Sequence, residues 1–283
     1  MQKTHQDAQR LSAAPDAPTR HPLNVDFKWQ RAPGTKLRRL TPQQFDDYNE
    51  LGFTRIENAF TPAEIAAVIA AIDPIEQRRE QYMKEHQGGR VRLSEADIIT
   101  FTVHIARESP VLSAFAAHPA IKDVCHDLIG DNVRLYWDQS VYKKTSKPQE
   151  FPWHQDNGYT FIEPQQYLTL WIPLVDVDNE NGCPWIAPGL HKLGTLQHWL
   201  TSIGKQCLES APNAVCVPAK AGDIIAFSSL APHRTGPNLR KDTVRKAYIL
   251  QYAPDGAYAI AEDGSRIAQT DSERQFKILD GGR

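Results

Sequence analysis

The chain has 283 residues, of which 41% are hydrophobic and 23% charged; this is enough apolar material for a sizeable core and excludes a wholly disordered protein. Its 32 basic and 34 acidic side chains give a formal charge of −2, which argues against a general nucleic-acid binder. Apolar runs such as residues 65–72 are too short to span a bilayer, and the first ten residues lack the apolar core of a secretory signal. We therefore expect a soluble protein that acts on neither nucleic acid nor membrane.

The cysteines are sparse and widely spaced. None of the four has a neighbour at the short spacing of a zinc knuckle or a redox motif; they are Cys125, Cys183, Cys207 and Cys216. This pattern predicts reduced, partly buried thiols in a cytoplasmic protein.

Residues 1–38 are polar and rich in proline, without a sustained apolar period. They are predicted to form a flexible N-terminal arm, the alternative being a strap that packs over a partner or a pocket. Residues 39–283 are predicted to form one domain.

Helices are expected first along this domain. Thr41-Pro42 is a helix start, and the helix that follows it ends at Gly52. A strand is expected over residues 53–56, and a capping box of Thr61 and Glu64 opens a helix that reaches about residue 72. Residues 73–110 are charged and look irregular, as on a solvated surface, or as an insert that closes over a site as a lid. A pair of helices is expected over residues 110–128.

After residue 132 the apolar pattern alternates with period two. Strands are expected over residues 133–142, 167–175, 214–218, 223–229 and 246–252. Helices followed by many short strands predict a mainly β fold with flanking helices, built as an antiparallel sandwich.

Three side chains have the chemistry of a metal site. His154 and Asp156 are separated by one residue next to a strand, so their side chains point to one side. His233 follows another strand and supplies a second imidazole. Two imidazoles and one carboxylate on one face leave coordination positions open, as a non-haem Fe(II) oxygenase requires. The same ligands would also suit another divalent metal in a hydrolase or isomerase.

Arg245 and Thr235 extend this group. A guanidinium and a hydroxyl near a metal form a fork for a carboxylate, although an arginine at a strand edge is equally compatible with a salt bridge. Gln139 and Lys143 share a strand face with Trp137, which favours a pocket wall over a pure core.

The sequence resembles the phytanoyl-CoA dioxygenase family of Fe(II)/2-oxoglutarate oxygenases over about residues 40–255. The resemblance rests on stretches that occur in family order, namely DQSVYKK, WHQDNGY, LWIPL, NENGCPWIAPGLHK, AGDIIAF and PHRTGPN…RKAYILQY. It implies a double-stranded β-helix (jelly-roll, cupin-like) core, and an enzyme that uses Fe(II), 2-oxoglutarate and O₂ and releases succinate and CO₂.

By this resemblance His154, Asp156 and His233 match the iron ligands. Arg245 matches the arginine that pairs with the distal carboxylate of 2-oxoglutarate, and Thr235 the hydroxyl beside it. Three further residues fall where the family lines the cosubstrate pocket: Gln139, Lys143 and Trp171. Alternation alone decides between Lys143 and Lys144 as the lysine that faces the pocket. The presence of Asp156 favours hydroxylation over halogenation.

The sequence gives less information about the substrate. Aromatic residues close to the metal ligands in sequence are expected to wall an apolar pocket: Trp137, Trp153, Tyr159 and Phe161. His104, with the arginines of residues 78–92, would meet an anionic group if the 73–110 segment closes over the site. A small molecule, such as an amino acid or a natural-product intermediate, is preferred to an acyl-CoA. The chain is expected to be a monomer or a homodimer.

Overall fold

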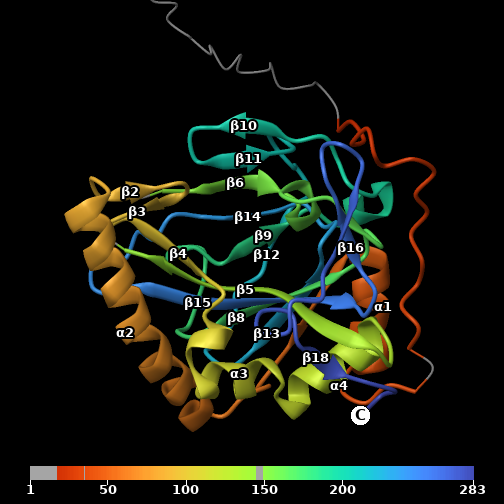
Figure 1. The fold of residues 1–283 in the computed structure, drawn as a ribbon, viewed down its shortest axis with the longest axis horizontal. Helices are drawn as coiled ribbons and strands as arrows, with labels where there is room; N and C mark the ends of the chain where they lie inside the picture. The colour runs from red at the N-terminus through yellow and green to blue at the C-terminus, as the bar shows by residue number, and fades with distance from the viewer. Residues whose placement is uncertain (1–17, 35, 145–148) are drawn as a thin grey trace, which may run out of the picture.

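The computed structural model describes residues 18–34, 36–144 and 149–283. Most of the described helical structure precedes the main run of strands, as expected from the sequence (Figure 1). The α-helices and 3₁₀ turns of this part of the chain are α1 (Pro42–Leu51), α2 (Pro62–His86), α3 (Pro110–Ala116), α4 (Pro119–Leu128), η1 (Ala106–Glu108), η2 (Asp156–Gly158) and η3 (Leu190–Leu193).

The first two helices begin as their sequences predict. Thr41 accepts a hydrogen bond from the backbone of Gln44, whose side chain returns to the cap, and Thr61 and Glu64 form the same reciprocal box. Helix α1 ends at Gly52, which has the left-handed backbone (φ 90°) that glycine adopts at low cost. These predictions are confirmed.

The segment expected to be irregular is largely regular. Helix α2 does not end near residue 72 but continues through Pro74 to His86. Its buried residues recur at helical spacing on the face that packs against the domain, whereas Arg78, Arg79 and Lys84 lie on the exposed face. The charges are therefore those of an amphipathic helix. The rest of residues 73–110 contains η1 and three strands of the main sheet, β2 (Arg90–Val91), β3 (Ser94–Glu95) and β4 (Ile99–Val103).

The main sheet has nine antiparallel strands among the described residues. Their order is β1-β13-β8-β15-β5-β4-β3-β2, with β18 paired to the end of β5. The bounds not yet given are β1 (Phe53–Ile56), β5 (Val133–Lys143), β8 (Leu168–Pro173), β13 (Ile224–Ser228), β15 (Arg245–Pro254) and β18 (Lys277–Leu279).

A four-stranded sheet lies over the main sheet (Figure 1). Its order is β12-β9-β14-β6, and its strands are β6 (Phe151–His154), β9 (Pro184–Ile186), β12 (Val215–Cys216) and β14 (His233–Thr235). Sequence periodicity marked only β12 here, because strands of two to four residues are too short to show an alternating pattern.

Two smaller sheets complete the described strands. They comprise a hairpin of β10 (Trp199–Thr201) and β11 (Gly204–Gln206), and a three-stranded sheet of β7 (Ile162–Glu163), β16 (Tyr258–Ile260) and β17 (Arg266–Ala268).

Strand β8 shows how the main sheet separates two environments. Leu168, Leu170 and Ile172 pack in the large core beneath the helices, together with residues of α2, α3 and α4. Trp171, on the opposite face, packs between the two sheets with residues of β9 and β13. Because both faces are covered, every residue of β8 is buried. The mainly β sandwich with flanking helices is thus confirmed.

The described part of the N-terminal arm, residues 18–34 and 36–38, forms no helix or strand but lies along the domain. Asn24 is buried and its amide donates to the carbonyl oxygens of Leu193 and Thr195, each at 2.9 Å. The Trp29 ring packs edge-on against His191 at 4.4 Å. These contacts tie the described part of the arm to the domain; residues 1–17 lie outside the described part. No helix in the described residues combines the length and apolar character needed to cross a membrane.

Candidate metal and cosubstrate site

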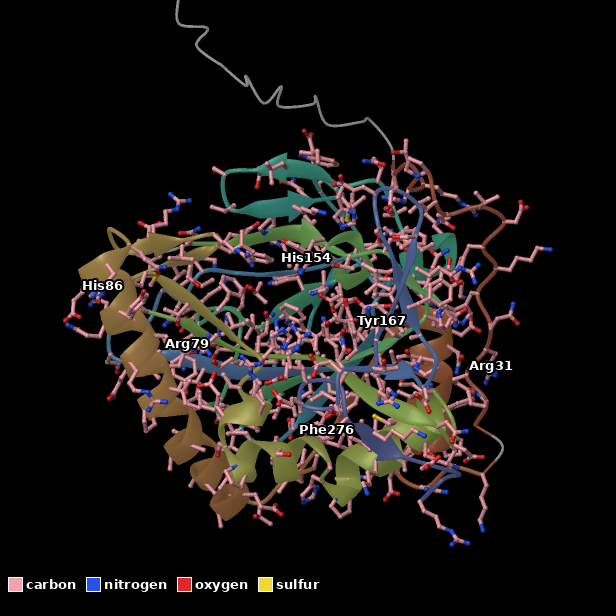
Figure 2. All side chains as sticks on the ribbon, in the orientation of Figure 1. Arg31, Arg79, His86, His154, Tyr167 and Phe276 are labelled. Carbon is pink, nitrogen blue, oxygen red and sulfur yellow. The ribbon has the colours of Figure 1, made fainter. Side chains whose placement is uncertain are left out.

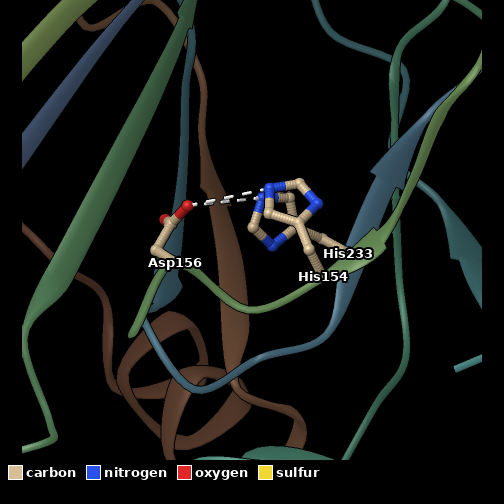
Figure 3. A group of neighbouring side chains, drawn as sticks. All are labelled: His154, Asp156 and His233. Atoms are coloured by element: carbon tan, nitrogen blue, oxygen red, sulfur yellow. Dashed lines mark ion pairs between the residues drawn. The ribbon is translucent and has the colours of Figure 1, made fainter. Parts of the chain in front are cut away.

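His154, Asp156 and His233 converge between the two sheets (Figure 3), and Figure 2 labels His154 at this place in the whole molecule. His154 is the last residue of β6 and pairs in register with His233, the first residue of β14. Asp156 follows at the start of η2. The Nε2 atom of each histidine lies 3.8 Å from Oδ1 of Asp156, so three potential ligand atoms face one point.

Both imidazoles are oriented by backbone carbonyls. Nδ1 of His154 lies 2.8 Å from the Pro152 oxygen, and Nδ1 of His233 lies 3.0 Å from the Ala231 oxygen. With Nδ1 as donor, the Nε2 lone pair of each ring points to the shared space, as metal ligation requires. Burial, and then the neighbouring His233, lower the pKa of His154 well below its ordinary value, which favours the neutral, ligating form.

The aspartate is held by a residue that the sequence analysis did not single out. Thr169 of β8 donates its hydroxyl proton to Oδ2 of Asp156 at 2.5 Å. This bond leaves Oδ1 for the point that the histidines face. Strand alternation indicates the position of Thr169 in the sequence, because Thr169 and Trp171 share the inward face of β8.

This donor set fits Fe(II). The ligand atoms of the three residues all lie within 4.8 Å of one another, and two imidazoles with one carboxylate on one face leave positions for further ligands. His154 and His233 are also largely withdrawn from solvent.

Arg245 lies in the same cavity with unused hydrogen-bonding capacity. This residue is 1% exposed, and its Nη1 donates to the Val141 carbonyl at 3.3 Å. Its Nε and Nη2 atoms have no hydrogen-bond partner among the described residues. Burial lowers the pKa of Arg245 to about 9. Since a buried cation without a counter-charge is costly, this guanidinium fits a ligand carboxylate.

The cavity joins the guanidinium to the metal ligands. Besides Arg245 and the three ligands, it is lined by Gln139, Thr169, Thr235, Ile99, Phe101, Val141, Phe151, Trp171, Phe227 and Ile249. Gln139, Trp171 and Thr235 therefore lie where the sequence analysis expects the cosubstrate pocket.

Lys143 lies beside this pocket but does not line it. Its Nζ is directed at three backbone carbonyls, those of Thr235 (2.9 Å), Gly236 (2.6 Å) and Gln149 (3.2 Å). Lys144 points to the other side of the sheet and pairs with Glu80. Lys143 is thus the inward lysine. Its ammonium group donates to three backbone carbonyls and so stabilises the pocket wall instead of facing the pocket itself.

Two of the expected substrate residues border the cavity indirectly. Trp137 donates to Oε1 of Gln139 at 3.2 Å, which turns the Gln139 amide nitrogen away from the indole. The His104 ring packs edge-on against Trp137 at 4.3 Å. His104 has a positive φ of 57°, and its buried Nδ1 lacks a partner among the described residues.

The other three expected substrate residues lie in different surroundings. Tyr159 stands edge-on to His154 at 5.5 Å. Trp153 lies on the opposite face of β6 from His154, in a separate cluster and against the Arg234 guanidinium. Phe161 packs on His21 at 5.0 Å. The structure therefore does not place Trp153 or Phe161 in the cavity wall.

Two phenylalanines take the place expected for Trp153. Phe151 stands edge-on to His154 at 4.8 Å, and Phe101 lies 5.3 Å from Phe151. Phe101 belongs to β4, a strand that the sequence analysis treated as irregular, so it was not considered. Phe151 lies three residues before His154 and was overlooked in favour of Trp153.

Comparison with known proteins agrees with this geometry. The sequence profile of the phytanoyl-CoA dioxygenase (PhyH) family matches residues 48–247. The ectoine dioxygenase of Bordetella bronchiseptica is 25% identical over 227 residues, 71% of each chain. The methylphosphonate hydroxylase of Gimesia maris is 25% identical over 217 residues, 74% of this chain and 80% of the relative.

The fold has solved counterparts. The crystal structure of the epimerase SnoN in complex with Fe³⁺, alpha-ketoglutarate and nogalamycin RO matches with a TM-score of 0.66 and 20% identity, over 83% of this chain and 97% of SnoN. The double-stranded β-helix expected from the resemblance is thereby confirmed. The chain belongs to the phytanoyl-CoA dioxygenase family of Fe(II)- and 2-oxoglutarate-dependent oxygenases.

Proposed function

We propose that this enzyme hydroxylates an unactivated C–H bond of a small organic molecule, an amino-acid-like compound or a natural-product intermediate, with formation of succinate and CO₂. One observation carries the proposal: unpartnered N–H groups of Arg245 share a cavity with two histidines and an aspartate. This arrangement suits a dicarboxylate held at one end by Arg245 and at the other by a metal.

Different residues would bind the metal, bind the cosubstrate and exclude water. His154, Asp156 and His233 would hold the iron, which with 2-oxoglutarate supplies the oxidising power for O₂-dependent attack on C–H bonds. Arg245 and the hydroxyl of Thr235 would fix the distal carboxylate of 2-oxoglutarate. The apolar walls, with Phe101, Phe151 and Phe227 among them, exclude water from the reacting centre.

The aspartate ligand supports hydroxylation. A halogenating enzyme needs a position for a halide where this chain has the Asp156 carboxylate. That carboxylate is fixed by Thr169 at 2.5 Å, so the position is filled by an anchored ligand.

The walls favour a substrate whose reacting end carries no charge. Among the described residues that line the cavity, Arg245 is the one lysine or arginine, and the proposal assigns it to 2-oxoglutarate. Phe101, Phe151 and the Gln139 amide offer apolar contact and one hydrogen-bonding group. The Bordetella relative is named for ectoine, a compact organic molecule, and the Gimesia relative for methylphosphonate, so both compounds belong in a substrate test.

The test begins with the metal. Titrating the apo-protein with Fe(II) and then 2-oxoglutarate without oxygen should give the visible metal-to-ligand charge-transfer band, which His154→Ala should lose. Iron binding without this band would remove the proposed cosubstrate geometry.

The second part identifies the substrate. Succinate release should be followed with a panel containing ectoine, free amino acids, methylphosphonate and a phytanoyl-CoA. A substrate should stimulate succinate release and gain one oxygen atom by mass. A product formed only from the acyl-CoA or the phosphonate would overturn the proposed substrate class.

A further inference from the structure

Cys183 and Cys216 are in contact although they lie 33 residues apart in the chain. Their Sγ atoms are 3.1 Å apart, and a disulfide needs about 2.05 Å. The two cysteines are otherwise dissimilar, because Cys183 is fully buried whereas Cys216 is partly exposed. A reagent in solution therefore reaches the pair through Cys216.

The strand that carries Cys216 is short and lies at a sheet edge. Strand β12 has two residues and lies at the edge of the four-stranded sheet, where it pairs with β9 alone. Val217, the residue after β12, donates to the Pro184 carbonyl at 2.9 Å, so β12 cannot approach Cys183 alone. The movement that a disulfide requires is thus shared by the strands that carry Cys216 and Cys183.

Cys183 faces the cosubstrate end of the site. It packs in one cluster with Trp171 and Phe227, which line the cavity.

The residues on either side of Cys183 contact the part of the cavity wall that contains Thr235. Pro184 pairs with Thr235 across β9 and β14. Gly182 packs closely on the backbone that follows Thr235, where an added Cβ on Gly182 would lie 2.5 Å from the Gly236 oxygen. A shift at Cys183 is therefore transmitted to Thr235 and to the turn after it, because close-packed atoms cannot absorb the displacement locally.

We propose that Cys183 and Cys216 form a disulfide on exposure to a peroxide, and that this bond displaces the pocket wall at Thr235 and weakens 2-oxoglutarate binding. The Cys216 thiol is oxidised first, to a sulfenic acid with release of one water. The Cys183 sulfur then displaces the hydroxyl oxygen of this group as a second water. In total two thiols and one hydrogen peroxide give one disulfide and two waters.

The order of events follows from burial. Burial and the adjacent Cys216 raise the pKa of Cys183, so Cys183 remains a thiol while the accessible sulfur reacts.

The experiment uses the full chain without iron, so that peroxide meets no redox metal. After hydrogen peroxide treatment, alkylation and peptide mass spectrometry should find a cross-linked peptide pair containing Cys183 and Cys216. The number of alkylated cysteines should fall from four to two. Ni(II) is then added as a redox-stable substitute for iron, and 2-oxoglutarate binding is measured by calorimetry. The dissociation constant should rise about fivefold or more and return to its reduced value after dithiothreitol.

Two variants make the result specific. Cys216→Ser should abolish both the cross-link and the loss of affinity, whereas Cys207→Ala, which removes a buried cysteine of another cluster, should keep both. Oxidation without the 183–216 cross-link would overturn the proposal. So would a complete cross-link with unchanged 2-oxoglutarate affinity. The cross-link is read from mass alone, so this test is independent of the proposed hydroxylation.

Discussion

The Nζ atom of Lys143 lies 2.9 Å from the carbonyl oxygen of Thr235. This contact joins β5 of the main sheet to β14 of the four-stranded sheet at the cosubstrate end of the cavity. The same ammonium also binds the Gly236 carbonyl at 2.6 Å. The position of the Thr235 hydroxyl in the pocket thus depends on a lysine that does not itself line the pocket.

Lys143→Met should weaken both the fold and cosubstrate binding. It removes the donor of three buried carbonyls, which we expect to lower the free energy of unfolding by roughly 2–4 kcal/mol. It also frees Thr235, so 2-oxoglutarate affinity should fall while metal affinity stays. Urea unfolding and calorimetry measure the two effects.

Lys144→Met is the matched control for Lys143. Lys144 pairs with Glu80 on the other side of the sheet, where both side chains keep some exposure. Because this pair lies away from the cavity, its loss should leave 2-oxoglutarate affinity unchanged. Equal effects of the two substitutions would contradict the wall-supporting role of Lys143.

Arg245→Met should separate cosubstrate binding from metal binding. A charge-assisted pair with a carboxylate contributes roughly 1.5–3 kcal/mol, so 2-oxoglutarate affinity should fall by about 10- to 100-fold. Fe(II) or Ni(II) affinity should stay within a few-fold, because Arg245 contacts none of the three ligands. Arg245→Lys should bind 2-oxoglutarate weakly, since an ammonium cannot present two parallel N–H groups.

The control for Arg245 is Arg234→Met. Arg234 pairs with Glu150 and lies over the rings of Trp153 and Trp185, away from the cavity. Its loss should leave 2-oxoglutarate affinity intact. An unchanged affinity in Arg245→Met would remove Arg245 from the cosubstrate site.

Thr169→Val should lower metal affinity, because Thr169 orients the ligand Asp156. Valine keeps the shape of threonine but cannot donate a proton to Oδ2 of Asp156. A residue that orients a metal ligand typically contributes 10- to 100-fold in metal affinity. We expect that loss in a Ni(II) titration, with recovery in Thr169→Ser. A full loss in the serine variant would indicate that threonine acts by packing instead.

Much of this site could be predicted from the sequence, because its chemistry is concentrated in a few residue types. His154, Asp156, His233 and Arg245 stand beside strands at spacings that bring them together in a sandwich. The side of the sheet that each residue faces could also be predicted where alternation is long enough. This holds for Lys143, the last residue of the eleven-residue strand β5, and for Lys144, which follows it.

The missed features have physical causes. Strand β4 lies in a charged stretch, and its alternation is too short to stand out, so the inward position of Phe101 was not visible. Helix α2 passes through Pro74, which sequence rules treat as a break, yet packing of its apolar face maintains the helix. Trp153 looked like a pocket residue by proximity to His154, but it packs in a separate cluster. The register of β6 and β14 shifts between the pairs His154–His233 and Phe151–Thr235, so simple alternation does not hold here and Phe151 stands against His154 instead.

Asp138 gives the stability of this protein an unusual dependence on pH. Its side chain is 1% exposed, and Oδ2 accepts hydrogen bonds from the Ala106 amide at 2.9 Å and the Tyr248 hydroxyl at 3.1 Å. Burial outweighs these bonds and raises the pKa of Asp138 to about 6, from 3.8. Between these values the unfolded chain loses its proton first. Asp138 therefore lowers the free energy of unfolding as the pH rises through this window, by about 3 kcal/mol at about 1.4 kcal/mol per pKa unit.

Asp138→Asn removes this titration. The asparagine variant should gain stability relative to the parent between pH 4 and pH 7, by about 3 kcal/mol in urea unfolding of the metal-free protein. Any cost of placing an amide there is constant with pH and does not alter this slope. Asp255→Asn is the opposite control, because Arg134 and Lys277 lower the pKa of Asp255, so that variant should lose stability relative to the parent as the pH rises. If the difference between parent and Asp138→Asn were independent of pH, the buried carboxyl would titrate normally and the assignment to Asp138 would be wrong.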